Sequence, residues 1–215
     1  MATPTTPAPD AVTATSTTTT TGSLTRRGRA FVFGDNIDTD LLAPGPYMRK
    51  PVDVLASHCL EAVDPHFASD VVRGDIVVGG ASFGIGSSRE QAVQSLVFLG
   101  VGAIVAKSFA RIFYRNALNL GLPAVACPDL QAERGDDLEV RPVQGVVINH
   151  TSGQQYACET IPPELMEIVS VGGLMPWLAD RLAAEAKAAA AAGPVHGDPT
   201  LHVPDPRPSA AEVKR

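Results

Sequence analysis

Cysteine is scarce in this chain, and its spacing matches no familiar metal or redox motif. The 215 residues include 3 cysteines, Cys59, Cys127 and Cys158, which lie far apart and form no C-x-x-C pair. They supply no recognisable iron–sulfur motif. An odd, scattered set is typical of reduced thiols in the core of a cytosolic protein, so we expect a cytoplasmic location.

Long apolar runs and an excess of positive charge are also missing. No apolar run approaches the length of a membrane span. The segment 1–24 is mostly Thr, Ala and Pro and lacks the apolar core of a secretory signal peptide. The formal net charge is −6, which gives no basic footprint for nucleic acid. We therefore expect neither membrane nor nucleic-acid binding.

The usual nucleotide-binding loops are incomplete. In "ASFGIGSSREQA" (81–92), Gly84 and Gly86 begin a G-x-G, but Arg89 stands where a dinucleotide fingerprint needs its third glycine. That glycine allows close packing of helix on strand, so an arginine argues against the motif. A phosphate-binding P-loop needs a lysine, and none lies between Asp75 and Gly100.

Composition divides the chain into three parts. Residues 1–27 form a Thr-rich extension that we expect to be disordered. Residues 28–180 are long enough for one domain of ordinary size. Residues 181–215 contain the end of an Ala-rich helical run and a Pro-rich tail, for which we also expect disorder.

The central part has the pattern of an α/β fold. Apolar β-branched runs alternate with helix-like runs, which is typical of βαβ units around a parallel sheet. A meander of short antiparallel strands should follow, because turn residues divide the next apolar runs. We expect strands at 30–33, 75–79, 103–108 and 123–127, helical segments at 51–67 (with a break before Pro65), 88–98, 109–121 and from Pro163, and the meander within 137–159.

Two interpretations of the glycine-rich loop stand side by side. Ser87 and Glu90 are spaced as a capping box, in which the hydroxyl and the carboxylate satisfy backbone N–H groups of the first helical turn. A cap does not explain Arg89, a cation at the positive end of a helix dipole. Backbone N–H groups, the hydroxyls of Ser87 and Ser88 and this guanidinium would together suit a carboxylate.

Other cations belong to the same region. Lys107 and Ser108 end a predicted parallel strand, and ligands of open α/β sheets gather at the carboxyl ends of strands. Arg111 and Arg115 are four residues apart and share one helix face. They either stay solvated or pair with carboxylates, or one of them closes over the anion site.

The polar segment after the first strand also has two interpretations. Asp38 and Asp40 flank Thr39, and an Asx-rich turn that holds its own backbone is favoured over a metal site. His58 and His66 are expected at the surface and not as metal ligands.

Three motifs together are similar to one known family. "GDNIDTD", "FGIGSSREQA" and "AKSFARIFYRNALNLGLP" occur in that order with compatible spacing. They resemble the small subunit of 3-isopropylmalate dehydratase, of the aconitase superfamily, over about residues 28–173. The resemblance implies a swivelling α/β domain that closes over a separate large subunit. That subunit would carry the [4Fe–4S] cluster, so this chain itself should bind no cofactor or metal.

The resemblance also implies roles for single residues. Ser87 would be the base that removes a proton next to a carboxylate, Arg89 would grip the substrate carboxylate, and Ser88 would donate a hydrogen bond in the same site. A substrate-reading loop would include Tyr47 and Arg49. In the family, a cationic or an apolar residue at the position of Arg49 distinguishes between substrates that carry different side groups.

Three functions follow from these patterns. The first is the small subunit of a heteromeric hydro-lyase that interconverts 2-isopropylmalate and 3-isopropylmalate by dehydration and rehydration in leucine biosynthesis. The second is the small subunit of a homoaconitase, a 2-methylmalate dehydratase or a 2,3-dimethylmalate dehydratase. The third is a non-catalytic RNA-binding module. The acidic charge and the intact Ser-Ser-Arg argue against the third.

Overall fold

The computed structural model describes residues 24–192. The extension and the Pro-rich tail expected to be disordered therefore lie outside the described residues, apart from residues 24–27 and 181–192. No helix in the described range is both long and apolar enough to cross a membrane.

One mixed sheet organises the described residues. Its strands run in the order β4-β3-β2-β1-β5-β6-β7, with β1 to β4 parallel and β5 to β7 antiparallel. The predicted α/β class, with a parallel core and an antiparallel meander, is confirmed. The strands are β1 (Arg26–Val32), β2 (Ile76–Gly79), β3 (Ala103–Ala106), β4 (Ala124–Ala126), β5 (Asp137–Arg141), β6 (Val146–Asn149) and β7 (Gln154–Ala157).

Strand burial follows from the residue types. β2, β3 and β4 consist of Ile, Val, Ala and Gly and are buried at every position, as parallel strands covered on both faces must be. In β5 and β6, buried positions alternate with half-exposed ones. β1 begins at Arg26, four residues before the expected strand, because Arg26 to Arg29 pair with β5.

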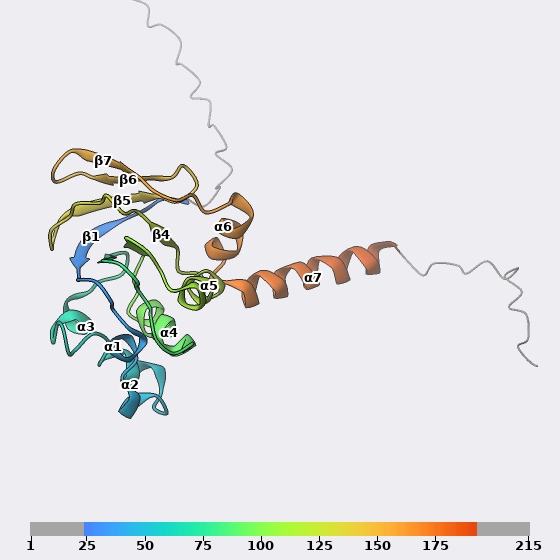
Figure 1. Ribbon diagram of the computed structural model, residues 1–215. Coiled ribbons are helices and arrows are strands. Elements are labelled where there is room, and N and C mark those ends of the chain that lie inside the picture. Colours follow the sequence, from blue (N-terminus) through green and yellow to red (C-terminus); the bar gives the residue numbers. More distant parts are fainter. Residues whose placement is uncertain (1–23, 193–215) are drawn as a thin grey trace, which may run out of the picture. The chain divides into compact units, whose positions relative to one another are not determined.

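Helices connect and cover the strands. Figure 1 shows α1 to α4 together on one side of β1, with β5 to β7 on the other. The helices are α1 (Thr39–Leu42), the 3-10 helix η1 (Gly45–Tyr47), α2 (Val52–Ala56), α3 (Phe67–Asp70), α4 (Glu90–Phe98), α5 (Arg111–Asn119), α6 (Pro163–Ser170) and α7 (Leu174–Ala192).

The expected helix over 51–67 is wrong for most of its length. In the first part of this segment only Val52–Ala56 is α-helical, and tight turns follow this short helix. Leu60 adopts a left-handed backbone with φ 60°, is fully buried, and donates its N–H to the Leu41 carbonyl at 2.8 Å. This contact with α1 reverses the chain, and helical periodicity alone does not reveal it.

Two apolar clusters lie on opposite faces of the sheet. Phe31, Val77 and Ile104 point toward the side packed by α1 to α5. Ala30, Ile76 and Val105 point toward a second cluster that includes Leu138 and Val147 of the meander. Because successive residues of a strand face opposite ways, each parallel strand contributes to both clusters.

Candidate active site

The glycine-rich loop 80–89 follows β2 and is held by backbone hydrogen bonds on both sides. One side joins it to residues 37–39 after β1, and the other joins it to residues 108–110 after β3. The bonds run from Gly84 N–H to the Ile37 carbonyl (2.7 Å), from Thr39 N–H to the Ile85 carbonyl (2.9 Å), from Phe83 N–H to the Ser108 carbonyl (2.9 Å) and from Ala110 N–H to the Phe83 carbonyl (2.9 Å). Two segments that are distant in sequence thus fix the loop at the carboxyl ends of the parallel strands.

Two glycines give this loop its path. Gly84 has φ 76°, and a Cβ placed there would lie 2.1 Å from Cγ of Phe113. Gly86 has φ 107°, and its Cβ would lie 3.0 Å from Oγ1 of the buried Thr39. Positive φ and close neighbours both favour glycine, so the loop backbone lies directly on Phe113 and Thr39.

Ser87 and Ser88 do not cap α4. The helix begins at Glu90, Arg89 is the N-cap residue, and no side chain forms a capping bond. The predicted capping box is therefore wrong. Arg89 N–H donates instead to the Ser87 carbonyl at 2.8 Å, in a tight turn that carries the serines outside the helix. Both serines are exposed, so capping does not account for their hydroxyls.

Arg89 is positioned from one side. Its Nη1 forms an ion pair with the Asp40 carboxylate and donates to the Ala43 carbonyl at 3.2 Å. The side chain is 24% exposed. No partner within residues 24–192 occupies its Nε or Nη2. A guanidinium held by one nitrogen can offer its remaining donors to a carboxylate.

The two aspartates next to Thr39 have different roles. Asp38 caps α1, and its carboxylate accepts from Leu41 N–H at 2.8 Å. The Asx interpretation is thus confirmed for Asp38, whereas Asp40 binds Arg89. In the described part of the chain, no three His, Cys, Asp or Glu residues are grouped so that they could hold a metal ion.

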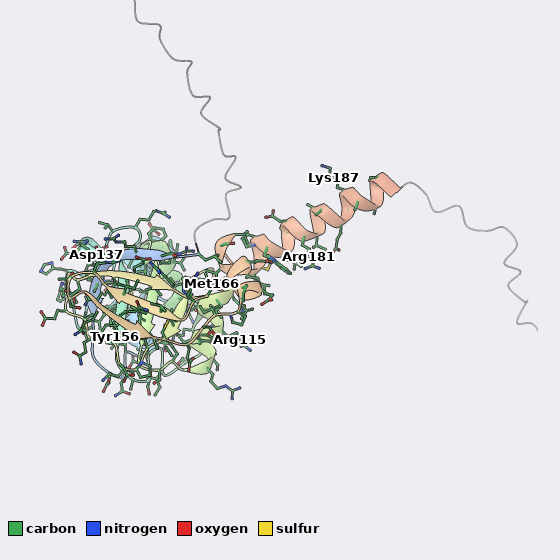
Figure 2. All side chains as sticks on the ribbon, turned by 90° about the horizontal axis from the view of Figure 1, so that it is seen from above. Arg115, Asp137, Tyr156, Met166, Arg181 and Lys187 are labelled. Carbon is green, nitrogen blue, oxygen red and sulfur yellow. The ribbon has the colours of Figure 1, made fainter. Side chains whose placement is uncertain are left out.

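Ser87 lines a hollow of about 680 Å³ between the loop and α5. Arg111 and Arg115 line the same hollow from α5. Arg115 lies at the outside of the molecule (Figure 2). Lys107 and Ser108 line a neighbouring hollow of about 390 Å³, which also includes Arg111.

Tyr47 and Arg49 lie on the connection between α1 and α2, apart from that hollow. The Tyr47 ring stacks on His58, with centroids 3.6 Å apart and planes at 4°. His58 Nδ1 lies 2.6 Å from the Glu61 carboxylate. His58, which we expected at the surface and not as a metal ligand, therefore supports Tyr47. Arg49 is exposed and forms no ion pair with any described residue.

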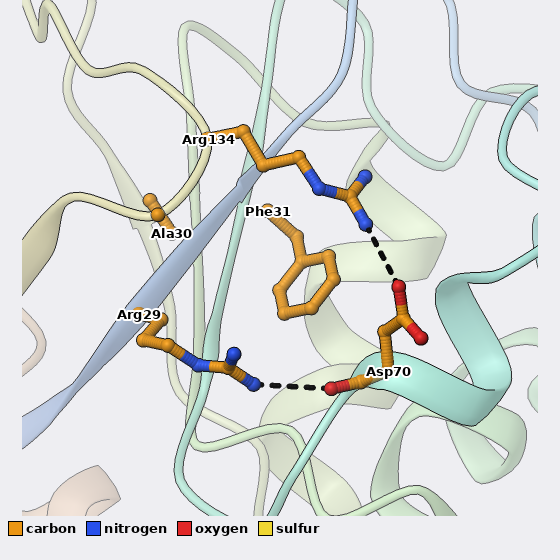
Figure 3. Close-up of a pocket in the computed structure, with 6 residues that line it drawn as sticks. Arg29, Ala30, Phe31, Asp70 and Arg134 are labelled. Atoms are coloured by element: carbon orange, nitrogen blue, oxygen red, sulfur yellow. Dashed lines mark hydrogen bonds and ion pairs between the residues drawn. The ribbon is translucent and has the colours of Figure 1, made fainter.

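A second arginine-lined hollow, of about 250 Å³, lies at the opposite end of the sheet. Figure 3 shows Phe31 between Arg29 and Arg134, whose guanidinium carbons lie 5.7 and 4.7 Å from the ring centroid. Arg29 pairs with Asp75 at 2.8 Å, and Arg134 pairs with Asp64 and Asp70. Carboxylates engage both arginines, and no serine, histidine or cysteine among the described residues lines this hollow, so the cluster joins β1 to its neighbours and is not a candidate active site.

The cysteines are poorly suited to bind metal. Cys59 and Cys127 are buried, and Cys158 is half-buried. Burial raises the pKa of the Cys59 thiol, raises that of Cys127 to about 11, and raises that of Cys158 to about 12. Among the described residues, none of these thiols belongs to a group of three His, Cys, Asp or Glu side chains that could hold a metal ion.

Known proteins match this chain over the fold and the site. The family model for the aconitase C-terminal domain matches residues 48–129, a range that contains the loop and α5. The 3-isopropylmalate dehydratase small subunit 1 of Thermotoga maritima is 47% identical over 155 residues, which are 71% of this chain and 93% of that protein. The chain belongs to the family of aconitase-type hydro-lyase small subunits.

Members of this family with different names are equally similar to the chain. The methanogen homoaconitase small subunit of Methanothermobacter thermautotrophicus is also 47% identical, over 150 residues that are 69% of this chain and 88% of that protein. The crystal structure of a 3-isopropylmalate dehydratase from Methanocaldococcus jannaschii aligns with a TM-score of 0.72 and 41% identity. It covers 76% of this chain and 99% of its own. The resemblance seen in the three motifs is confirmed.

Proposed function

We propose that this hydro-lyase small subunit belongs to a 3-isopropylmalate dehydratase, which interconverts 2-isopropylmalate and 3-isopropylmalate by dehydration and rehydration in leucine biosynthesis. The names of the Thermotoga relative and of the solved Methanocaldococcus structure support this substrate. The observation that carries the proposal is the exposed Ser87, which lines the hollow and takes no part in a helix cap.

Ser87 is the proposed base. A serine hydroxyl removes a proton next to a carboxylate only if its alkoxide is stabilised. Here the start of α4 and the guanidinium of Arg89 follow within three residues, and both favour negative charge. Closure of a partner over the hollow would exclude water and strengthen both effects.

Arg89 and Ser88 are proposed to bind the substrate. Asp40 and Ala43 hold Nη1 of Arg89, so the guanidinium has a fixed direction before substrate arrives. Its other donors suit a two-pronged grip on a carboxylate. Ser88 is exposed beside it and would add a hydroxyl donor.

The partner and the cofactor are part of the same proposal. Both relatives cited above are named as small subunits, which supports a large subunit for this chain. A [4Fe–4S] cluster on that large subunit would supply a Lewis acid for the departing hydroxyl. The buried thiols of this chain do not suit such a cluster, so its cysteine ligands belong to the partner in this proposal.

A homoaconitase small subunit is the second candidate. Arg49 favours it, because an exposed cation without an ion pair among the described residues suits a substrate whose side group is a carboxylate. An isopropyl group gains nothing from a guanidinium. In either case Tyr47, which is held by His58, would form the apolar wall of the substrate-reading loop.

The test uses the chain reconstituted with its large subunit under anaerobic conditions. Conversion of isopropylmalate, and none of homoaconitate, is the expected result for the wild type. Ser87→Ala should lower kcat at least about 100-fold with KM nearly unchanged, since general-base catalysis contributes about that much. Arg89→Lys should instead raise KM, because lysine keeps the positive charge but cannot donate two parallel hydrogen bonds to a carboxylate.

Ser152→Ala, in the exposed turn between β6 and β7, is the matched control. It should leave both constants unchanged. A fully active Ser87→Ala enzyme would disprove the assigned role. Preference for homoaconitate would establish the second candidate.

A further inference from the structure

The exposed face of α5 concentrates positive charge beside Ser87. Arg111 and Arg115 are four residues apart, are exposed, and line the hollow of about 680 Å³ together with Ser87. Neither forms an ion pair within residues 24–192, although Glu159 lines the neighbouring hollow beside Arg111. Like charges at this spacing destabilise a helix, and Arg111 also lies at the positive end of the helix dipole.

Such an arrangement is stabilised when an anion binds to it. The N-terminal end of α5 is fixed against the loop, because Ala110 N–H donates to the Phe83 carbonyl and Phe113 packs against Gly84. The helix backbone that carries the two arginines therefore has a defined place relative to Ser87. Both arginines are exposed, and both line the hollow that Ser87 lines.

Arg89 lies toward the other flank of the loop. Its contacts, Asp40 and Ala43, belong to the segment after β1, which hydrogen-bonds one edge of the loop. The α5 arginines follow the segment after β3, which hydrogen-bonds the other edge. Ser87 thus has one cation on one flank and a pair of cations on the other.

We propose that Arg111 and Arg115 bind the second carboxylate of a dicarboxylate substrate, while Arg89 binds the first. The proposal rests on the proposed function, because alkylmalates are 1,4-dicarboxylates. Two separate cationic contacts hold such a molecule with its α-carbon between them, at the Ser87 hydroxyl. A monocarboxylate can use only one of the contacts.

The experiment compares two inhibitors on the reconstituted complex. Succinate has two carboxylates and butyrate has one, on chains of equal length. Arg111→Gln, Arg115→Gln and the double variant keep the shape of a polar side chain and remove the charge. Lys187→Gln, on the exposed α7, removes one charge elsewhere and serves as the control. Calorimetry gives both dissociation constants without requiring turnover.

The succinate constant should rise at least about tenfold in the double variant, since a hydrogen bond to a charged group contributes about 1.5–3 kcal/mol. The butyrate constant should change less than about twofold, and Lys187→Gln should change neither. An unchanged ratio of the two constants would overturn the proposal. So would loss of binding to the large subunit in the double variant, because the arginines would then be partner contacts.

The two proposals fail separately. If the wild-type complex does not convert isopropylmalate, the proposed function is wrong, and the succinate and butyrate constants still test the arginine pair. If it converts isopropylmalate but the double variant retains the wild-type ratio, only the assignment of the arginine pair is wrong.

Discussion

Replacement of Gly84 by alanine should destabilise the chain through one contact. A Cβ at this position would lie 2.1 Å from Cγ of Phe113, which is 3% exposed. Phe113 cannot move away freely, because it packs against Phe83 and Phe109 at centroid distances of 5.4 and 6.4 Å. The loop or the aromatic cluster must therefore shift to admit the methyl group.

The magnitude has two parts. An L-residue in the left-handed region costs about 1–2 kcal/mol. Overpacking in a tight interior adds about 1–3 kcal/mol, for a total of about 2–5 kcal/mol. Gly153→Ala separates the two parts, because Gly153 has φ 73° against 76° at Gly84 and nothing lies within 4 Å of its Cβ position. Gly153→Ala should lose only the free energy that the left-handed backbone costs. The effect of alanine on the unfolded chain is common to both variants.

Urea unfolding of the chain without its partner measures the difference. With a slope of about 1–3 kcal/mol per molar, Gly84→Ala should unfold at a midpoint roughly 1 M below that of Gly153→Ala. The double variant Gly84→Ala/Phe113→Ala should lose less unfolding free energy than the sum of the losses in the two single variants, because removing the ring makes room for the new methyl group. Equal midpoints for the two glycine variants would refute the reasoning about Phe113.

Four further outcomes are expected. Burial would raise the pKa of Asp75, but hydrogen bonds from the Arg29 side chain and from backbone N–H groups lower it overall. Its contribution to stability is therefore present above the unfolded pKa of about 3.9 and is lost as the pH falls further. Asp75→Asn should accordingly be less stable than wild type at pH 7, with a gap in unfolding free energy that narrows as the pH falls below the unfolded pKa; a gap that is constant with pH would contradict this. Asp40→Asn should raise KM of the reconstituted enzyme about two- to fivefold, the value of an exposed ion pair with Arg89, and an unchanged KM would show that Arg89 needs no such support. His58→Ala should cost about 0.5–1.5 kcal/mol of unfolding free energy through the lost Tyr47 stack, whereas His58→Phe should retain it; equal losses in both variants would rule out stacking as the cause. The purified chain should contain no stoichiometric iron by elemental analysis, and visible iron–sulfur absorbance would contradict the assignment of the cluster to the large subunit.

Local patterns were sufficient to predict most of the sheet. The runs in β2, β3 and β4 are apolar throughout, so their type and approximate bounds could be read directly. The order of the motifs also placed the loop at the carboxyl ends of the strands. These features depend on neighbours in sequence, which a single chain displays.

The features that could not be predicted depend on contacts between residues that lie apart in the sequence. Arg89 pairs with Asp40 across 49 residues, and no local signal links them. The capping box failed because the loop is held by backbone bonds to two other segments, which turn Ser87 away from the helix. Tyr47 and His58 lie on either side of α2, and their contact depends on the turns that flank this short helix, in a region where a longer helix was expected.

The central place of β1 has a consequence for how the chain is made. Although β1 is the first strand, its antiparallel neighbour β5 is far downstream, and Arg27 pairs with Asp137 across 110 residues. A ribosome needs roughly 5–20 s to synthesise that length. During this interval β1 can pair with β2, and the loop with Ser87 can settle, while the other edge of β1 is still open. An open strand edge is prone to associate with other chains. The nascent subunit therefore passes through a stage in which the loop with Ser87 has formed but β1 is not yet protected from aggregation.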